Sequence, residues 1–216
     1  MPLEYEYSFY DFNKKEIITK IKTMGFKCKG VFLFKVQTFN HPLFLINKDK
    51  DKDKDKHYIR VRDEGHRITM THKFTSDGNF EDETEVNVDN FEAAVKILEN
   101  TGCTKKYYYE KIREIWFNKD TEVVFDTNPG NIDRMEIEAK SKKELNSIIK
   151  SLELNSKIGD KTNKYLELFG IIIPKNIDLK FTSAKKSLLP HVKKNKKEFI
   201  ELVNEQVKKY KKLLKK

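Results

Sequence analysis

The 216-residue sequence predicts an α+β fold of antiparallel strands covered by helices. The first observation is alternation, because charged and apolar residues follow each other with period two in several segments, which is typical of strands. The second is a set of segments with apolar residues at helical spacing, each bounded by capping residues or glycine. The third is a charged fraction of 36%, with no apolar run of the roughly 18–20 residues that a membrane-spanning helix needs.

Capping residues and glycines delimit five predicted helices. They cover residues 13–25, 89–102, 141–152, 160–170 and about 195–214. Asn13 and Asp89 are the expected N-caps of the first two, and Ser141 with Glu144 reads as a capping box for the third. The alternating lysine–aspartate run within residues 47–57 is expected to be a flexible surface loop.

Six segments carry charged side chains on one strand face and apolar side chains on the other. The polar faces consist of Glu4 and Glu6; Arg60 and Arg62; Arg67, Thr69, Thr71 and Lys73; Glu83 and Glu85; Lys111 and Arg113; and Arg134, Glu136, Glu138 and Lys140. One interpretation is an antiparallel sheet whose polar side faces water. The other is closure of about eight strands into a barrel with the helices outside, so that the charged faces point into the lumen.

A charged lumen restricts the ligand, because buried charges are costly unless they are paired with each other or with an ionic ligand. Arginine suits bidentate contacts with phosphate oxygens, and carboxylates suit hard divalent cations. A nucleotide or inorganic triphosphate with Mg²⁺ or Mn²⁺ therefore fits. The sequence contains no P-loop and no G-x-G-x-x-G motif, which excludes a glycine-rich loop as the phosphate cradle.

Eight short motifs occur in order along the first 170 residues. They are Glu4-x-Glu6, Tyr58-Ile59-Arg60-Val61-Arg62, Arg67-Ile68-Thr69-Met70-Thr71-His72-Lys73, Asp82-Glu83-Thr84-Glu85-Val86, Lys111-Ile112-Arg113, Phe125-Asp126, Met135-Glu136-Ile137-Glu138 and Lys164-Tyr165-Leu166-Glu167-Leu168. In this order and spacing they resemble the CYTH family of triphosphate tunnel metalloenzymes over about residues 1–170. The last motif resembles the late lysine-tyrosine motif of the class IV adenylyl cyclase branch.

The resemblance implies an eight-stranded antiparallel closed β-barrel, or tunnel, with helices packed outside. It places Glu4, Glu6, Glu136 and Glu138 at metal-binding positions, with Asp126 and one or both of Glu83 and Glu85 nearby. It places Arg60, Arg62, Lys73, Lys111, Arg113 and Lys164 at phosphate-binding positions, and Lys73, Lys111 and Arg113 become the candidate catalytic residues. The implied cofactor is Mg²⁺ or Mn²⁺. The family's first motif is normally E-x-E-x-K, whereas this chain has Ser8 at the lysine position.

Three functions follow from this resemblance. The leading one is metal-dependent hydrolysis of a nucleoside, thiamine or inorganic triphosphate. The second is cyclisation of ATP to cyclic AMP, as in class IV adenylyl cyclases. The third is nucleotide binding without catalysis, with Ser8 marking a lost activity.

The net charge of +10 is confined to the C-terminus, since residues 174–216 hold 14 lysines against four carboxylates. We therefore expect a body at 1–173 and a basic C-terminal extension at 174–216 with an amphipathic helix. The extension could bind nucleic acid or another acidic partner, or it could be a solvated helix face. The chain is expected to be a monomer or a homodimer.

Several residues have two interpretations. The N-terminus lacks the basic-then-apolar order of a secretory signal, and Cys28 and Cys103 have no C-x-x-C partner, so we expect a cytoplasmic protein with reduced thiols. Trp116 and the Tyr107-Tyr108-Tyr109 run could stack a base, although packing within strands is the simpler interpretation. Asp63 and Glu64 precede Gly65, so both are expected to be solvated turn residues.

Overall fold

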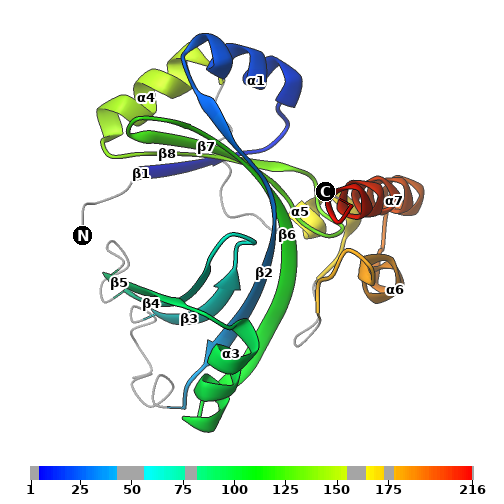
Figure 1. Cartoon of the computed structure of the whole chain (residues 1–216). Helices are drawn as coiled ribbons and strands as arrows, with labels where there is room; N and C mark the ends of the chain where they lie inside the picture. Colours follow the sequence, from blue (N-terminus) through cyan, green and yellow to red (C-terminus); the bar gives the residue numbers. More distant parts are fainter. Residues whose placement is uncertain (1–4, 43–55, 76–81, 155–163, 173–177, 216) are drawn as a thin grey trace, which may run out of the picture.

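The computed structural model describes residues 5–42, 56–75, 82–154, 164–172 and 178–215. Its eight strands form one antiparallel sheet in the order β1-β8-β7-β6-β2-β3-β4-β5, which confirms the predicted α+β class (Figure 1). The strands are β1 (Tyr5–Phe9), β2 (Lys27–Asn40), β3 (Lys56–Asp63), β4 (Ile68–Thr75), β5 (Asp82–Val88), β6 (Thr104–Asn118), β7 (Thr121–Thr127) and β8 (Arg134–Ala139). Within these ranges no helix is long and apolar enough to cross a membrane.

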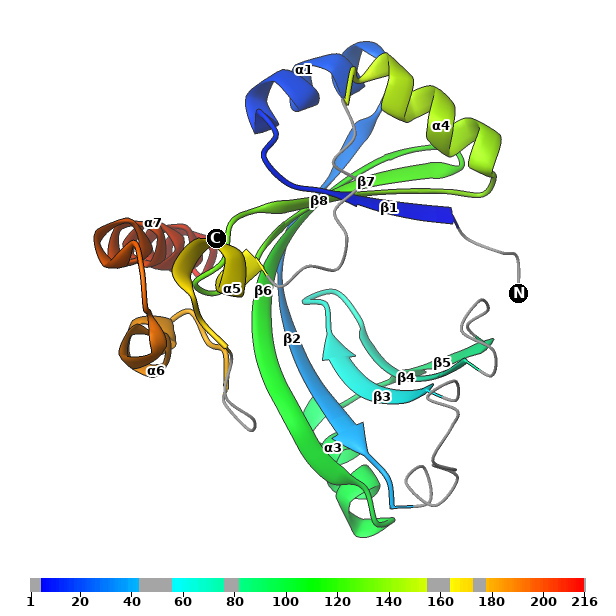
Figure 2. The same ribbon diagram turned by 180° about the vertical axis from the view of Figure 1, so that it is seen from behind.

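The sheet is strongly curved around the long β2–β6 ladder, so that it has a concave and a convex side (Figures 1 and 2). Two register shifts interrupt this ladder, between Cys28 and Gly30 and between Thr38 and Phe39. Such irregularities bend a strand locally and increase its twist. A glycine is required at the first of these register shifts. The φ of Gly30 is +145°, and a Cβ there would lie 2.9 Å from the Phe32 ring.

Closure into a barrel by hydrogen bonds is not confirmed. Among the described residues β1 pairs only with β8 and β5 only with β4, so both strands are sheet edges. They lie apart in both views (Figures 1 and 2). The curvature is carried by β2 and β6, which span 14 and 15 residues, and it leaves the described parts of the two edge strands unpaired with each other. The structure is a curved, open sheet.

Helices pack on the convex side of the sheet. They are α1 (Lys14–Thr23), α3 (Phe91–Asn100), α4 (Lys142–Ser151), α5 (Lys164–Phe169), α6 (Ala184–Leu188) and α7 (Lys196–Leu213), with a 3₁₀ turn η1 (Leu189–His191). Asn13 and Ser141 cap α1 and α4 as predicted, each accepting a hydrogen bond from the backbone N–H three residues later. The cap of α3 is Asn90, which accepts from Ala93 N at 2.8 Å, and not the predicted Asp89.

Two predicted segments, the 47–57 loop and the 160–170 helix, lie only partly within the described residues. Of the predicted 47–57 loop, residues 47–55 lie outside the described residues, and residues 56 and 57 belong to β3, where they pair with β4. The pairing is supported by the His57 ring, which lies 4.6 Å from the Phe74 ring. The start of the predicted 160–170 helix also lies outside the described residues, and α5 covers its second half.

The core fixes which face of each strand is polar. Ile21 of α1 and Leu145 of α4 pack with Ile137 of β8 in one buried cluster on the convex side. In a second cluster, Val95 of α3 packs with Val61 of β3. Because side chains alternate along a strand, the charged neighbours of these apolar residues point to the concave side. The inward orientation is therefore the one that the structure has.

The apolar stripe of the C-terminal extension packs on this same chain. Phe199 and Val203 of α7 are buried with Leu188 of α6 and with Phe169 and Ile171 from the preceding body. The cluster thus joins residues on both sides of the predicted boundary at residue 173. The division into a body and a separate extension stays a prediction.

Candidate functional site

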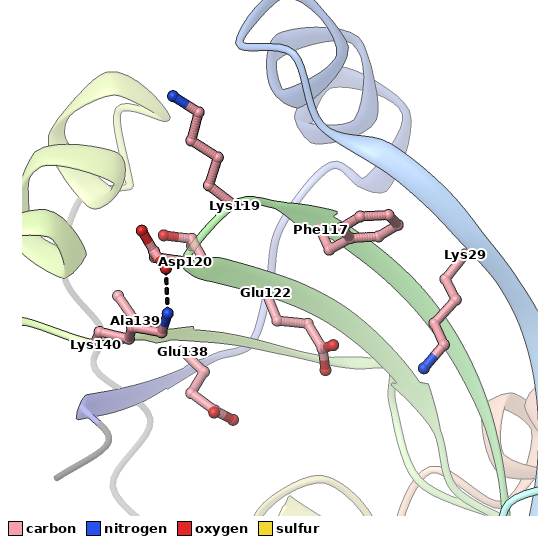
Figure 3. Close-up of a pocket in the computed structure, with 9 residues that line it drawn as sticks. Lys29, Phe117, Lys119, Asp120, Glu122, Glu138, Ala139 and Lys140 are labelled. Atoms are coloured by element: carbon pink, nitrogen blue, oxygen red, sulfur yellow. Dashed lines mark hydrogen bonds and ion pairs between the residues drawn. The ribbon is translucent and has the colours of Figure 1, made fainter. Parts of the chain in front are cut away.

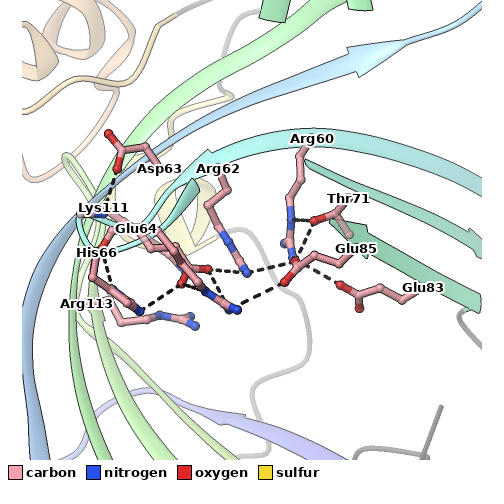
Figure 4. A network of polar contacts seen from close by, with 12 residues as sticks. Arg60, Arg62, Asp63, Glu64, His66, Thr71, Glu83, Glu85, Lys111 and Arg113 are labelled. Atoms are coloured by element: carbon pink, nitrogen blue, oxygen red, sulfur yellow. Dashed lines mark hydrogen bonds and ion pairs between the residues drawn. The ribbon is translucent and has the colours of Figure 1, made fainter. Parts of the chain in front are cut away.

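One group of charged residues on the concave side comes from β3, β4, β5 and the β3–β4 turn (Figure 4). Strand pairing places Lys73 opposite Glu83, and Thr71 opposite both Arg60 and Glu85. We call this group the Arg62 cluster; its members are Arg60, Arg62, Glu64, Arg67, Thr71, Lys73, Glu83 and Glu85. Lys73 Nζ lies 2.7 Å from Glu83, and Glu85 accepts hydrogen bonds from Thr71 Oγ1 at 2.8 Å and Arg62 Nη2 at 3.4 Å.

Glu64 belongs to this cluster, which corrects the expectation of a solvated turn residue. Its side chain is buried, and Arg67 Nε donates to Glu64 Oε2 at 2.7 Å while Arg62 pairs with the other carboxylate oxygen. Burial would raise the pKa of Glu64, but the hydrogen bond from Arg67 and the charge of Arg62 outweigh burial and hold the pKa below its ordinary value. Glu64 therefore remains ionised inside the concave side.

A second group comes from β6, β7 and β8. We call it the Asp126 cluster; its members are Lys111, Arg113, Asp126, Arg134 and Glu136. Asp126 has no exposed surface and accepts from Lys111 Nζ at 3.0 Å and from Arg113 at 2.6 and 2.7 Å. Arg134 Nη2 reaches both Asp126, at 3.3 Å, and Glu136, at 2.6 Å. The alternation of β8 predicts Arg134 on a charged strand face, but no sequence motif assigns it a role in the site.

Burial and ion pairing shift the pKa values of this cluster in opposite directions. Burial would raise the pKa of Asp126, but the charges of Lys111 and Arg113 hold that pKa well below its usual range. Burial lowers the pKa of Lys111 to about 8, although Asp126 acts in the opposite direction. Asp126 is thus an ionised partner of three basic groups, and each of those groups is held on the concave side.

Phe34 of β2 connects the two clusters. Its ring is 2% exposed, and it lies 5.8 Å from the guanidinium of Arg62, 5.4 Å from Lys111 Nζ and 5.5 Å from the guanidinium of Arg113. An aromatic face attracts cations, so one ring can hold three of them close together. Figure 4 shows these three basic side chains on facing parts of the curved sheet. The arrangement concentrates positive charge where the two clusters meet.

The predicted carboxylate site lies on β1 and β8. The register places Glu6 opposite Glu138 and Ser8 opposite Glu136. The pKa of Glu6 is raised to about 7, first by burial and then by the neighbouring Glu136 carboxylate, although the residue as a whole is exposed. Carboxylate oxygens are the ligands that hard divalent cations prefer, so these residue types suit Mg²⁺ or Mn²⁺. Glu4 lies outside the described residues.

The other predicted metal residues are placed differently. Glu83 and Glu85 belong to the Arg62 cluster and pair there with basic residues, and Asp126 is already surrounded by three cations. Within the described part of the chain, no group of three or more His, Cys, Asp or Glu side chains is arranged to hold a metal. The register places Glu6, Glu136 and Glu138 at neighbouring positions of β1 and β8, but their side chains do not form such a group, and Glu83 and Glu85 lie on another part of the sheet.

A pocket of about 430 Å³ opens beside the carboxylates, at the β6–β7 turn (Figure 3). Glu122 of β7 lies opposite Glu138 in the register, and both line the pocket together with Lys29 of β2. Burial raises the pKa of Glu122. Glu122 was not identified from the sequence, although it alternates in phase with Val124 and Asp126. Lys140, which was assigned to the inner face, is instead exposed beyond the end of β8 and pairs with Asp120.

Three buried side-chain atoms have no hydrogen-bond partner in the described part of the structure. They are Arg62 Nε, Thr69 Oγ1 and Arg134 Nε. All three side chains belong to polar strand faces on the concave side, because Thr69 lies opposite Arg62 and Arg134 lies opposite Asp126. Buried donors without partners are rare in native proteins. These donors fit an anionic ligand with several acceptor oxygens.

Other candidates have clear positions. Lys164 is the first residue of α5, and its side chain is outside the described part. Trp116 is buried in the convex cluster and donates from Nε1 to Glu114 at 2.8 Å, which agrees with strand packing and not with base stacking. Burial raises the pKa of Tyr109, whose position on β6 is opposite Val36.

Several solved structures share the fold of this chain. The structure is similar to that of a protein from Pyrococcus horikoshii OT3, with a TM-score of 0.60 at 20% identity over 75% of this chain and 97% of that chain. A conserved hypothetical protein from Pyrococcus furiosus matches with a TM-score of 0.59 at 18% identity, over 76% of this chain and 99% of that chain. A candidate adenylate cyclase from Vibrio parahaemolyticus matches with a TM-score of 0.56 at 14% identity, over 69% and 88%.

At these identities the structural similarities show a shared fold. No curated protein matches the sequence. The CYTH domain family model matches residues 14–169, which is more than half of the chain and includes both charged clusters. The chain therefore belongs to the CYTH family, a family of enzymes that act on triphosphates and generally depend on divalent metals.

Proposed function

We propose that this protein is a divalent-metal-dependent enzyme that hydrolyses the triphosphate chain of a nucleoside, thiamine or inorganic triphosphate. The observation that carries the proposal is the meeting of the Arg62 and Asp126 clusters around Phe34, with unpartnered arginine donors on the same side. A triphosphate matches this site because it offers many acceptor oxygens and several negative charges along one short chain.

Binding exchanges one set of ion pairs for another. In the described structure the basic residues of both clusters are paired with carboxylates, for example Lys73 with Glu83 and Arg113 with Asp126. A triphosphate that arrives with a divalent cation brings both signs of charge at once. Its phosphate oxygens replace carboxylates as partners of the basic residues, and its cation offsets the carboxylates. The cation reduces the negative charge that the triphosphate brings, and the basic residues of the two clusters offset the remainder.

Glu6, Glu136 and Glu138 would hold the divalent cation. When bound, the cation would polarise a phosphoryl oxygen and offset negative charge on the triphosphate. Glu6 must release its proton to take part, because its pKa is raised to about 7 in the free protein. Glu136 is in addition held in place by a hydrogen bond from Arg113 at 2.6 Å and by an ion pair with Arg134 at 2.6 Å.

The basic residues would position the phosphates and stabilise the charge that develops during transfer. Arg60, Arg62 and Lys73 approach from β3 and β4, whereas Lys111 and Arg113 approach from β6, so a chain of phosphates can be held from two sides. Lys111 Nζ keeps its proton at neutral pH, since the pKa is about 8, and donates hydrogen bonds to phosphate oxygens from a buried position.

Arg134 would supply the cation that the chain lacks at position 8. Ser8 lies opposite Glu136 in the register, so a lysine at this position would sit beside that carboxylate. Arg134, two residues from Glu136 on β8, already contacts it at 2.6 Å and has a buried Nε without a partner. We infer that the loss of the lysine is compensated and that catalysis is retained.

Product analysis tests the proposal. The protein would be incubated with ATP, thiamine triphosphate and tripolyphosphate, each with Mn²⁺ or Mg²⁺, and the products identified by ³¹P NMR and ion-exchange chromatography. Release of phosphate or pyrophosphate that stops in Glu136→Gln but continues in Glu205→Gln, a change at an exposed carboxylate on α7, would support the proposal. Cyclic AMP from ATP would instead identify a cyclase. Binding without any product would identify a nucleotide-binding protein.

A further inference from the structure

One buried side chain of the C-terminal extension, Gln206 of α7, is hydrogen-bonded to a loop of the sheet. Its side chain is 2% exposed. Gln206 Oε1 accepts a hydrogen bond from Gly130 N at 2.8 Å, and Gln206 Nε2 donates to Asn128 O at 3.0 Å and to Asn131 O at 2.6 Å. Both ends of this carboxamide therefore bind the backbone of a single loop, which joins β7 to β8.

That loop lies between two residues of the Asp126 cluster. Asp126 is the next-to-last residue of β7, and Arg134 is the first residue of β8. The loop ends at Asp133, whose Oδ1 accepts from Thr127 Oγ1 at 2.7 Å and whose Oδ2 lies 3.2 Å from Lys209 Nζ of α7. Helix α7 thus contacts the loop at two points, and the ends of the loop adjoin both charged residues.

The loop is also in close apolar contact with the extension. Gly130 has a φ of +74°, and a Cβ there would lie 2.7 Å from Leu188 Cδ1 and 3.1 Å from Phe199 Cε2. Glycine is needed at this position for both reasons, since L-residues with a side chain disfavour this backbone conformation. The loop therefore has little room to move while α6 and α7 are in place.

We infer that the C-terminal extension is part of the triphosphate site, and that Gln206 is a positioning residue that holds Asp126 and Arg134 through the β7–β8 loop. This inference rests on the proposed function. According to this inference, residues outside the 14–169 family match contribute to triphosphate binding. It also differs from the predicted division into a body at 1–173 and a separate basic extension at 174–216.

The consequence of losing Gln206 follows from its hydrogen bonds. Replacement by methionine keeps the length and removes the carboxamide, so the Gly130 N–H and the Asn131 carbonyl lose the partner that Gln206 provides, while Asn128 O retains Asn131 N. The loop must then shift to recover hydrogen bonds with water. A displacement of about 1 Å at a positioning residue can lower activity by roughly 100-fold. We therefore expect Gln206→Met to weaken binding of tripolyphosphate with Mn²⁺ by about 10- to 100-fold.

The experiment compares Gln206→Met with Val203→Ala in the full-length protein. Val203 is also buried on α7, but it packs in the apolar cluster and offers no polar side-chain group to the loop. Calorimetric titration with tripolyphosphate and Mn²⁺, and KM and kcat for the best substrate, are measured below the melting temperatures of both variants. Hydrogen exchange of residues 127–134 reports on the loop directly.

We expect Gln206→Met to bind tripolyphosphate more weakly and to exchange faster in residues 127–134, while Val203→Ala loses stability and retains its affinity. Unchanged affinity in Gln206→Met would overturn the inference. Equal weakening in both variants would also overturn it, because the extension would then act only through overall stability. Should Gln206→Met not fold, Gln206→Asn, which keeps the amide but shortens its reach by one methylene, carries the same test.

Failure of the proposed function gives a different result. If the wild-type protein binds no triphosphate, the proposed function is wrong whatever the variants do. The hydrogen-exchange comparison then still decides whether Gln206 orders the β7–β8 loop, and equal exchange in wild type and Gln206→Met would refute that part separately.

Discussion

Arg62→Met separates the binding role of a basic residue from its role in stability. The Arg62 side chain is 14% exposed, its Nε is buried without a partner, and its pKa is lowered by burial and then by the charge of Arg60. The charged form is therefore costly in the free protein. Its partners keep other contacts, since Glu64 retains Arg67 at 2.7 Å and Glu85 retains Thr71 at 2.8 Å. We expect the free energy of unfolding to change by no more than about 1 kcal/mol in either direction.

The expected loss of affinity is much larger. A hydrogen bond to a charged group contributes about 1.5–3 kcal/mol net, and each 1.4 kcal/mol is a factor of ten in the dissociation constant. Removing the Arg62 guanidinium should therefore raise the dissociation constant for tripolyphosphate with Mn²⁺ by roughly 10- to 140-fold. Methionine removes the guanidinium, and with it the cation–π contact with the Phe34 ring at 5.8 Å, but retains an unbranched apolar side chain at this position.

Calorimetric titration measures the affinity, and urea denaturation measures the stability. Lys105→Met is the control, because Lys105 is an exposed basic residue outside both clusters, where it pairs with Glu99 and its side chain is 48% exposed. We expect the control to bind with an affinity within about threefold of wild type, since exposed charges contribute little. Unchanged affinity in Arg62→Met would refute the reasoning, because Arg62 would then serve only the ion pairs within the protein.

Three further predictions concern other parts of the site. Ser8→Lys should leave turnover within about threefold of wild type, because Arg134 already supplies the cation beside Glu136, and a large gain in steady-state rate would show that no compensation exists. The pKa of Glu6 is raised from its ordinary value near 4.5 to about 7, so the metal-free protein should lose stability as the pH rises through that interval. Mn²⁺ binding, followed by the melting temperature, should strengthen from pH 6 to pH 8 as this proton leaves, and the trend should be absent in Glu6→Gln. Arg113→Met should lower the free energy of unfolding in urea by about 3 kcal/mol, because it removes the two shortest contacts of the buried Asp126, and a loss below about 1 kcal/mol would contradict this.

The faces of the strands could be predicted because alternation is a local property. Arg60 and Arg62 alternate with Ile59 and Val61, and once α3 packs on Val61 the direction of both arginines follows. Closure could not be predicted in the same way, because it depends on whether the two edge strands meet. That depends on the bulges and relative lengths of β2 and β6, and strand alternation does not report these.

The errors within the site also have local causes. Glu64 was assigned to solvent because Asp63 and Gly65 surround it with turn residues, yet Arg67, three residues later, turns back and pairs with it. Gln206 shares the apolar stripe of α7 with Phe199 and Val203, and a polar residue on such a stripe is a signal of a buried hydrogen-bonding role. Its partners could not be found from the sequence, since Gly130 lies 76 residues away.

The most direct test of the proposed site is calorimetric titration of the full-length protein with tripolyphosphate, with and without Mn²⁺, compared with the Glu136→Gln/Glu138→Gln double variant. Both carboxylates lie on the concave face of β8, between apolar residues that pack outward. We predict that Mn²⁺ strengthens tripolyphosphate binding in the wild type and that this gain disappears in the double variant while the protein stays folded. An equal gain from Mn²⁺ in both proteins would contradict the assignment of the metal to these carboxylates. The absence of any tripolyphosphate binding by the wild type would contradict the concave face as a triphosphate site.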